Sequence, residues 1–97
     1  MLTMKNPPHP GEMIGDSLDE MGVTIVEAAK ALGVSRQQLH NVIAGRSAIV
    51  PEMAYRLERA LGSTADAWLR MQASHDLARI RARGASIKVG KLRRKAA

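Results

Sequence analysis

The side chains best suited to chemistry lie between residues 35 and 41, in the sequence Ser-Arg-Gln-Gln-Leu-His-Asn. An arginine can grip guanine through two hydrogen bonds in the major groove of DNA, and glutamine or asparagine can grip adenine similarly. Serine, asparagine and an open helix N-terminus can hold phosphate. If this segment is a helix with its apolar residues inward, it presents a DNA-reading face. That face would consist of Ser35, Arg36, Gln37, His40 and Asn41.

Two short helices joined by a tight turn are expected to position this face. Such a pair needs a small residue where the helices approach, a turn former between them, and apolar residues at helical spacing. Ala29 and Gly33 meet the first two demands, and Val34, Leu39 and Val42 meet the third. Residues 25–45 therefore predict a helix-turn-helix.

The ends of these two helices carry capping signals. Thr24 stands three residues before Glu27, and Ser35 stands three residues before Gln38, so each helix is predicted to begin with a reciprocal capping box. Gly45 lies where a residue of positive φ would end the second helix. Together with the turn, these signals favour a DNA-binding motif over an ordinary helical pair.

The charge around the motif agrees with that interpretation. No acidic residue occurs between Glu27 and Glu52, whereas Lys30, Arg36 and Arg46 are basic. The alternative is a polar helix face that is merely solvated, which is the default for any single such residue. That alternative explains neither the turn nor the missing acids, so DNA binding is favoured.

Several classes of protein are disfavoured by composition. The chain has 97 residues, enough for one domain, and no cysteine, so no disulfide framework is expected. No apolar run approaches the roughly 20 residues that span a bilayer, and no signal peptide is visible, so we expect a cytoplasmic protein without a membrane partner. The three histidines stand far apart, and no nucleophile–base pair or phosphate loop occurs. We therefore expect that the protein is not an enzyme and that it binds no metal or cofactor.

The net charge of +6 is unevenly distributed. Residues 77–97 contain eight basic and no acidic residues, while residues 1–76 contain seven basic and nine acidic residues, a balance of −2. A basic tail can raise affinity for DNA through counterion release without adding sequence specificity. It can equally be a solvated terminus, and both interpretations stay open.

Helical periodicity predicts an all-α fold of five helices. The first helix is expected over about 10–21, the helix-turn-helix supplies the next two, and the last two cover 51–61 and about 65–83. A loop over 1–9, a domain over 10–83 and a basic tail over 84–97 follow. In the fourth helix, Glu52 and Arg56 are expected to form an exposed i,i+4 pair. Its predicted core residues are Met53, Ala54, Leu57, Ala60 and Leu61.

The fifth predicted helix carries more apolar surface than a five-helix domain needs. Such a surplus suggests a subunit partner, and helix-turn-helix proteins commonly read two half-sites of a palindromic operator as a two-fold dimer. Alternatively, Trp68 and Leu69 complete the core of the monomer. The expected dimer contacts are Ala65, Trp68, Leu69, Met71, Gln72 and His75.

Four segments resemble the HigA family of bacterial antitoxins, within the lambda-repressor-like group. They are His-Pro-Gly-Glu-Met at 9–13, Ala-Gly-Arg at 44–46, Pro-Glu-Met-Ala-Tyr-Arg-Leu at 51–57, and Ala-Trp-Leu-Arg-Met-Gln at 67–72. The resemblance covers roughly residues 9–77. It implies a lambda-repressor-like fold and a homodimeric antitoxin that represses its own operon. It also implies a partner, a HigB toxin of the RelE-like fold that cleaves mRNA.

The resemblance also bears on the site residues. It maps the DNA-reading positions onto the face already described, and it adds Arg46 and the N-terminus of the helix at Thr24 near the DNA backbone. A stand-alone dimeric repressor without a toxin partner remains the alternative, because DNA reading is argued from the residues and toxin binding mostly from resemblance.

The first predicted helix is acidic, in contrast to the DNA-reading segment. A toxin that cleaves RNA must be basic enough to hold RNA, so an acidic helix would attract it. Acidic residues near a helix N-terminus are also stabilised by the helix dipole, which explains Glu12 and Asp16 at least equally well. The expected toxin-facing residues are Glu12, Asp16, Asp19 and Glu20.

Overall fold

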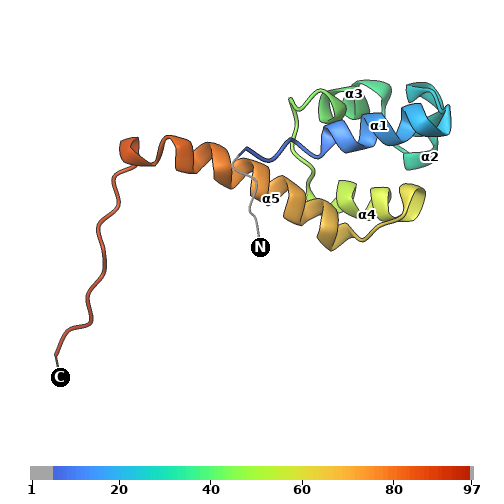
Figure 1. Cartoon of the computed structure of the whole chain (residues 1–97). Helices are drawn as coiled ribbons and strands as arrows, with labels where there is room; N and C mark the ends of the chain where they lie inside the picture. The colour runs from blue at the N-terminus through green and yellow to red at the C-terminus, as the bar shows by residue number, and fades with distance from the viewer. Residues whose placement is uncertain (1–5, 97) are drawn as a thin grey trace.

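The computed structural model describes residues 6–96, and this part of the chain folds into five α-helices without a strand (Figure 1). The prediction of an all-α, five-helix fold is therefore confirmed. Residues 1–5 of the predicted N-terminal loop and residue 97 of the predicted tail lie outside the described residues. The helices are α1 (Gly11–Met21), α2 (Ile25–Leu32), α3 (Arg36–Ile43), α4 (Pro51–Leu61) and α5 (Ala65–Ala82), followed by a 3-10 turn over Gly84–Ser86.

The predicted caps form at both helices of the motif, but only one of them is reciprocal. The Thr24 hydroxyl accepts from the Glu27 N–H at 3.1 Å, and the Glu27 carboxylate accepts from the Thr24 N–H at 3.0 Å. At α3, Ser35 Oγ accepts from the Gln38 N–H at 3.0 Å, with no bond in return from the Gln38 side chain. The prediction of a second reciprocal capping box is therefore wrong. A neutral, exposed amide forms a weaker hydrogen bond with a backbone N–H than a carboxylate does.

The start of α1 lies against the end of α3. A Cβ atom added to Gly11 would collide with the carbonyl oxygen of Val42, so glycine is what allows the two backbones to approach. His9, which is 8% exposed, accepts a hydrogen bond from the Gly11 N–H through Nδ1 at 2.9 Å. Residues 9–11 of the His-Pro-Gly-Glu segment therefore fix how α1 joins the motif.

The core is aliphatic, with one buried aromatic side chain among the described residues. Its most deeply buried members are Ile14, Leu39, Val42 and Leu57, and Trp68 from α5 covers them. The expected burial of Met53, Ala54 and Leu57 in α4 is confirmed, and Leu61 is half-buried. The predicted burial of Ala60 is wrong, because this residue is exposed. The last fully buried residue of α4 is Leu57, and Ala60 lines an open hollow beside α2.

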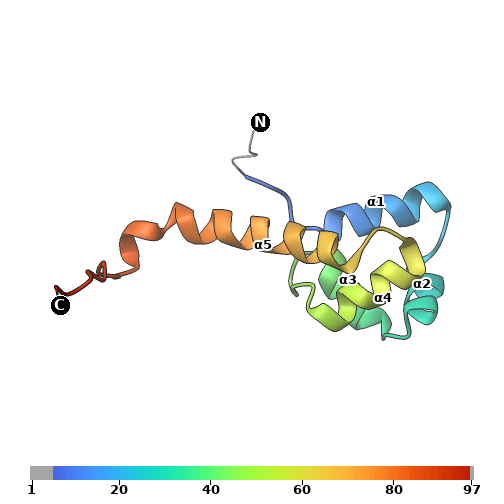
Figure 2. The same ribbon diagram turned by 90° about the horizontal axis from the view of Figure 1, so that it is seen from below.

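The helices form two groups that pack face to face. Helices α1, α2 and α3 lie together, and α4 packs against both α2 and α5 (Figures 1 and 2). In both views, the first half of α5 lies along the body while its second half and the tail extend away from it. Within residues 6–96, no helix is long and apolar enough to cross a membrane.

Candidate nucleic-acid interface

The predicted DNA-reading face is assembled on the exposed side of α3. Leu39 and Val42 turn inward and are 0% and 2% exposed, whereas Arg36, Gln37 and His40 face solvent. A hollow of about 480 Å³ separates these side chains from the start of α2. Its lining residues are Ile25, Ser35, Arg36, Gln37 and His40.

Ile25 is the member of this surface that the sequence did not indicate. It is the first residue of α2 and is half-buried. Its position directly after the capping Thr24 was the available signal, because the N-terminus of one motif helix must approach the face of the other. An aliphatic side chain at this place suits contact with a thymine methyl group or a sugar.

A small hydrogen-bond network organises the end of the face. The side-chain oxygen of Asn41 accepts from Gln37 Nε2 at 3.0 Å and from Arg46 Nε and Nη2 at 3.3 Å. The backbone carbonyl of Asn41 also accepts from the N–H groups of Arg46 and Ser47, at 2.9 and 3.1 Å. Asn41 therefore holds Gln37 and Arg46 in place, and its side-chain oxygen is already engaged in the free chain.

Thr24 and Glu27 are engaged with each other at the start of α2. The Thr24 hydroxyl donates to the Glu27 carboxylate at 2.9 Å, in addition to the two bonds of the capping box. Hydrogen bonds from the backbone and then from the side chain of Thr24 lower the pKa of Glu27. Glu27 is thus held in a cap at the N-terminus of α2, where the helix dipole favours its charge.

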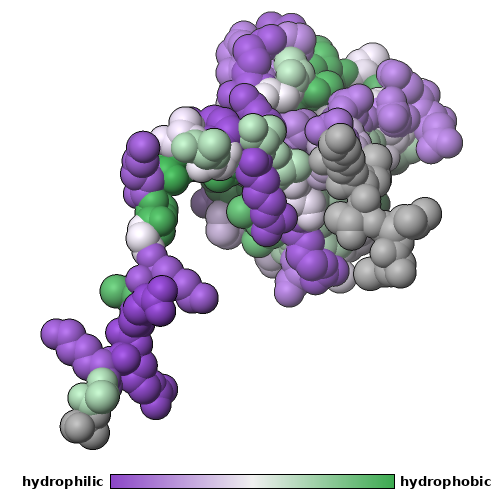
Figure 3. Space-filling model, turned by 60° about the vertical axis from the view of Figure 1, so that its left-hand side comes forward, coloured by the Kyte–Doolittle hydropathy of each residue, from purple (hydrophilic) through white to green (hydrophobic). Residues whose placement is uncertain are grey.

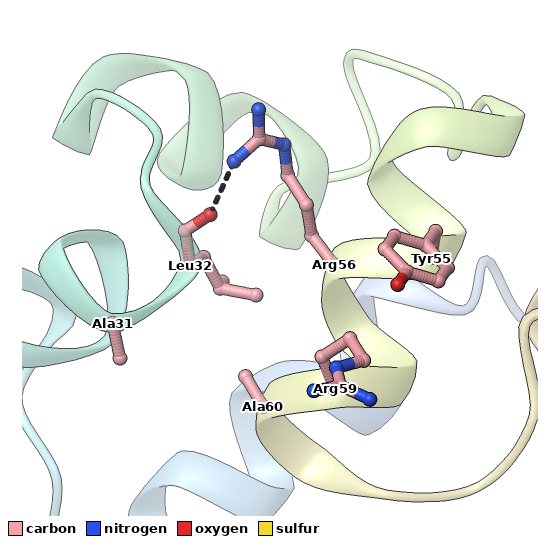
Figure 4. A pocket seen from close by; sticks show the side chains of 6 residues that line it. All are labelled: Ala31, Leu32, Tyr55, Arg56, Arg59 and Ala60. Atoms are coloured by element: carbon pink, nitrogen blue, oxygen red, sulfur yellow. Dashed lines mark hydrogen bonds between the residues drawn. The ribbon is translucent and has the colours of Figure 1, made fainter.

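The turn between α2 and α3 is held by a residue from α4. Arg56 Nη1 donates to the carbonyl of Leu32 at 2.8 Å (Figure 4). It also donates to the carbonyl of Gly33 at 3.4 Å. The predicted exposed pair with Glu52 is present at 3.2 Å. The contact with Leu32 was missed, because it joins residues 24 positions apart. Both residues of this contact also line an open hollow of about 270 Å³, together with Tyr55 and Arg59.

Comparison with known proteins agrees with this geometry. The model of the family described as Helix-turn-helix matches residues 16–68, more than half of the chain. The chain belongs to this helix-turn-helix family. It is 46% identical over 78 residues to virulence-associated protein A′ of Dichelobacter nodosus, covering 79% of this chain and 68% of that protein.

Two further relatives place this helix-turn-helix protein among DNA-binding antitoxins and transcriptional regulators. It is 38% identical over 76 residues to antitoxin HigA-1 of Vibrio cholerae, covering 77% of this chain and 71% of the relative. The solved structure of antitoxin HigA from Pseudomonas aeruginosa with the higBA promoter superposes with a TM-score of 0.77 and 31% identity. That match covers 84% of this chain and 90% of the other. The resemblance to the HigA family is therefore confirmed.

Two of the expected dimer contacts of this helix-turn-helix protein are buried inside the single chain instead. Trp68 is 3% exposed and Gln72 is 5% exposed. Gln72 accepts from the N–H of Ile49 at 2.8 Å and donates to Asp76 at 3.0 Å. The burial of Trp68 supports the alternative that it completes the core of the monomer, and Gln72 joins α5 to the loop before α4.

The other four expected contacts lie at the edge of the core. Ala65, Leu69 and Met71 are partly buried against it, and His75 Nδ1 contacts the carbonyl oxygen of Pro7 at 2.9 Å. Large apolar side chains that remain exposed on α5 lie further along: Leu77 is 45% exposed and Ile80 is 39% exposed. The apolar surface open to a partner therefore extends toward the free half of α5.

The histidines are not as separate in space as in the sequence. The rings of His9 and His75 meet edge to face, with centroids 5.1 Å apart. Burial lowers the pKa of His9, and the neighbouring His75 lowers it further. Within residues 6–96, no group of three His, Cys, Asp or Glu residues lies close enough together to hold a metal ion.

The four acids of α1, for which a toxin-facing role is expected, are all exposed. The same helix exposes two methionines, Met13 at 50% and Met21 at 59%. Met21, at the C-terminal end of the helix, is followed by Gly22, which closes α1 with a φ of 67°. α1 thus combines negative charge with adaptable apolar side chains.

Proposed function

We propose that this protein is an antitoxin that represses its own operon by reading DNA with α3. The observation that carries the proposal is the free face of α3, where Arg36, Gln37 and His40 are exposed beside the capped ends of α2 and α3. Ser35 and Thr24 would hold the helix ends against the DNA backbone, with Arg46 next to them. Asn41 would position Gln37 and Arg46, and would meet DNA only after the network rearranges.

Repression is proposed to require a homodimer on a palindromic operator. Two recognition helices joined by a two-fold axis would read half-sites about one helical turn apart. Leu77 and Ile80 support a dimer contact on α5, flanked by Ala65, Leu69, Met71 and His75. Ile80→Asp should lower the dimer fraction in analytical ultracentrifugation, whereas Val89→Asp in the exposed tail should not.

The DNA-reading proposal is tested with single substitutions on α3. Arg36→Ala or Gln37→Ala should weaken binding to the upstream region of the protein's own gene by about 1–3 kcal/mol and relax base preference. Arg59→Ala is the matched control, because it removes one exposed positive charge from α4. Equal losses for Arg36→Ala and Arg59→Ala, with no loss for the uncharged change Gln37→Ala, would show that charge alone, and not α3, governs binding.

Toxin neutralisation is proposed from the family together with the surface of α1. A HigB toxin of the RelE-like fold, which cleaves mRNA, would present a basic surface. Glu12, Asp16, Asp19 and Glu20 would attract that surface, and Met13 and Met21 would pack against it. The two partners would then bind different surfaces of the protein: DNA would bind the basic face of α3, and the toxin would bind the acidic surface of α1.

The antitoxin proposal is tested by co-expression with the product of the adjacent reading frame. Rescue of growth and a co-purifying complex are expected. Reversal of Asp16, Asp19 and Glu20 to lysine should weaken the complex more than their neutralisation to Asn, Asn and Gln. A neighbour that is neither toxic nor bound would leave a stand-alone dimeric repressor, the second candidate function, which needs only the α3 face.

A further inference from the structure

The basic tail, residues 84–97, carries most of the net charge of the protein. It contains five cations, Lys88, Lys91, Arg93, Arg94 and Lys95, and no acid, against a net charge of +6 for the whole chain. Without these residues the chain would be nearly neutral, at +1. A nearly neutral body has little long-range attraction for the phosphates of DNA, so this tail dominates any such attraction.

Nothing inside the described chain makes use of these five cations. The last internal hydrogen bond runs from the Ile87 N–H to the Gly84 carbonyl at 3.0 Å, and residues 87–96 are exposed throughout. Figure 3 shows the tail as a mostly hydrophilic segment that stands clear of the body. Arg79 and Arg81 differ from the cations of the tail, because they lie in the last turn of α5. There the helix dipole stabilises their positive charge.

The composition of the tail indicates which polyanion it suits. Of its three large apolar residues, Val89 and Leu92 would share one side of a helix and Ile87 would lie on another, so they form no apolar face wide enough for a lipid surface. The tail has no aromatic residue on which unpaired bases could stack. Positive charge without stacking or an amphipathic face fits the phosphates of duplex DNA.

The length of the tail suits a duplex that α3 already holds. Thirteen described residues follow α5 and its cap, and a fully extended chain covers roughly 3.3–3.6 Å per residue, or about 45 Å in all. One turn of duplex is about 34 Å long. Because the tail and α3 belong to the same chain, contacts of the tail with nearby phosphates are intramolecular once α3 is bound.

We propose that the basic tail binds the phosphate backbone of duplex DNA beyond the bases read by α3, through Lys88, Lys91, Arg93, Arg94 and Lys95. This inference rests on the proposed DNA binding of α3. The tail adds affinity equally for all sequences, while α3 supplies the preference among them. Two segments of the chain thus supply two different properties: the tail supplies affinity for phosphates, and α3 supplies sequence preference.

The test compares the full chain with a variant in which the five cations are replaced by glutamine. Both are titrated against two duplexes of equal length, the upstream region of the gene and a scrambled sequence, between 50 and 300 mM KCl. Each phosphate contact contributes about 0.9 to the slope of log K against log salt. We expect the slope to become shallower by about 2–4 for the five-glutamine variant, and both duplexes to bind at least about tenfold more weakly at low salt.

Two further variants serve as controls. Replacement of Ile87, Val89 and Leu92 by serine keeps the charge and should leave both affinities unchanged. Arg93→Lys with Arg94→Lys should do the same, since phosphates are met as point charges. Circular dichroism checks that each variant keeps the helical body.

Several outcomes would overturn the inference. An unchanged salt slope would show that the tail does not meet DNA, even if the tail proved to bind vesicles or a protein. A change in the ratio between the two duplexes would show that the tail reads bases. Failure of the proposed function is distinguishable: the full chain would then bind both duplexes alike, and Arg36→Ala would change neither, while the tail effect on slope would persist.

Discussion

The guanidinium of Arg56, on α4, donates a 2.8 Å hydrogen bond to the carbonyl of Leu32, the last residue of α2. The final carbonyls of a helix have no partner within it, and a positive charge at that end is favoured by the helix dipole. Gly33 follows with a φ of 74°, and a Cβ there would lie 2.8 Å from Arg56 Nη1. The glycine of the turn therefore serves both the turn conformation and the approach of Arg56.

Loss of this contact should loosen the turn between the two motif helices. Arg56→Ala is expected to destabilise the fold by about 1–2 kcal/mol in urea unfolding, because a charged hydrogen bond is lost at a partly exposed site. Glu52→Gln removes only the exposed ion pair and should change stability by less than about 0.5 kcal/mol. Equal effects of the two substitutions would contradict a special role for the contact with Leu32.

The approach of α1 to α3 should not tolerate a methyl group at its closest point. Gly11→Ala is expected to lower stability by about 1–3 kcal/mol, since the added Cβ meets backbone that cannot rotate away. Gly15→Ala is the matched control within the same helix. Its Cβ would meet only the end of the Ile43 side chain at 3.3 Å, and the gain in helix propensity of up to about 1 kcal/mol should offset that contact.

Stability should fall on mild acidification because of His9. Burial, together with the charge of His75, lowers its pKa below 6.5, so the folded state binds fewer protons than the unfolded state. The acids that face it, Asp76 and Glu12, oppose this shift, as does the hydrogen bond to the Ser47 backbone. The stabilising contribution is complete above pH 6.5 and is lost as the pH falls through the lowered pKa of His9.

Urea unfolding between pH 5 and 7.5 measures this effect. In that window His9→Asn should show a shallower pH dependence than the natural protein, while His40→Gln, at an exposed position, should keep the full dependence. The contribution of Glu27, whose pKa is lowered from 4.5, is complete above that value and is lost only at lower pH. A pH dependence that survives His9→Asn would assign the effect to another group.

The amide of Gln72 should matter for the fold of the monomer. Gln72→Ala leaves the buried N–H of Ile49 without its partner, which costs about 1–3 kcal/mol in thermal or urea unfolding. Gln38→Ala, at an exposed position of α3, should have a small effect. If Gln72→Ala shifted only the dimer fraction and left monomer stability unchanged, the placement of Gln72 in the core would be wrong.

Local signals in the sequence determined the helices and the face of α3. Capping residues act three positions away, and helical burial repeats every three or four residues, so Thr24, Ser35, Leu39 and Val42 could be assigned from near neighbours alone. The same local rule predicted that the Gln38 side chain accepts a hydrogen bond from the Ser35 N–H. That bond does not form, because water can hydrogen-bond an exposed amide in place of the backbone.

Tertiary structure alone decided how the five helices hold one another. Arg56 meets Leu32 across 24 residues, Gln72 meets Ile49 across 23, and His75 meets Pro7 across 68. These bonds depend on the positions of whole helices, which no periodicity within one helix specifies. The surplus of apolar residues on α5 was visible in the sequence, but only packing could show that Trp68 fills the core while Leu77 and Ile80 stay open, because burial is a property of what lies opposite a side chain.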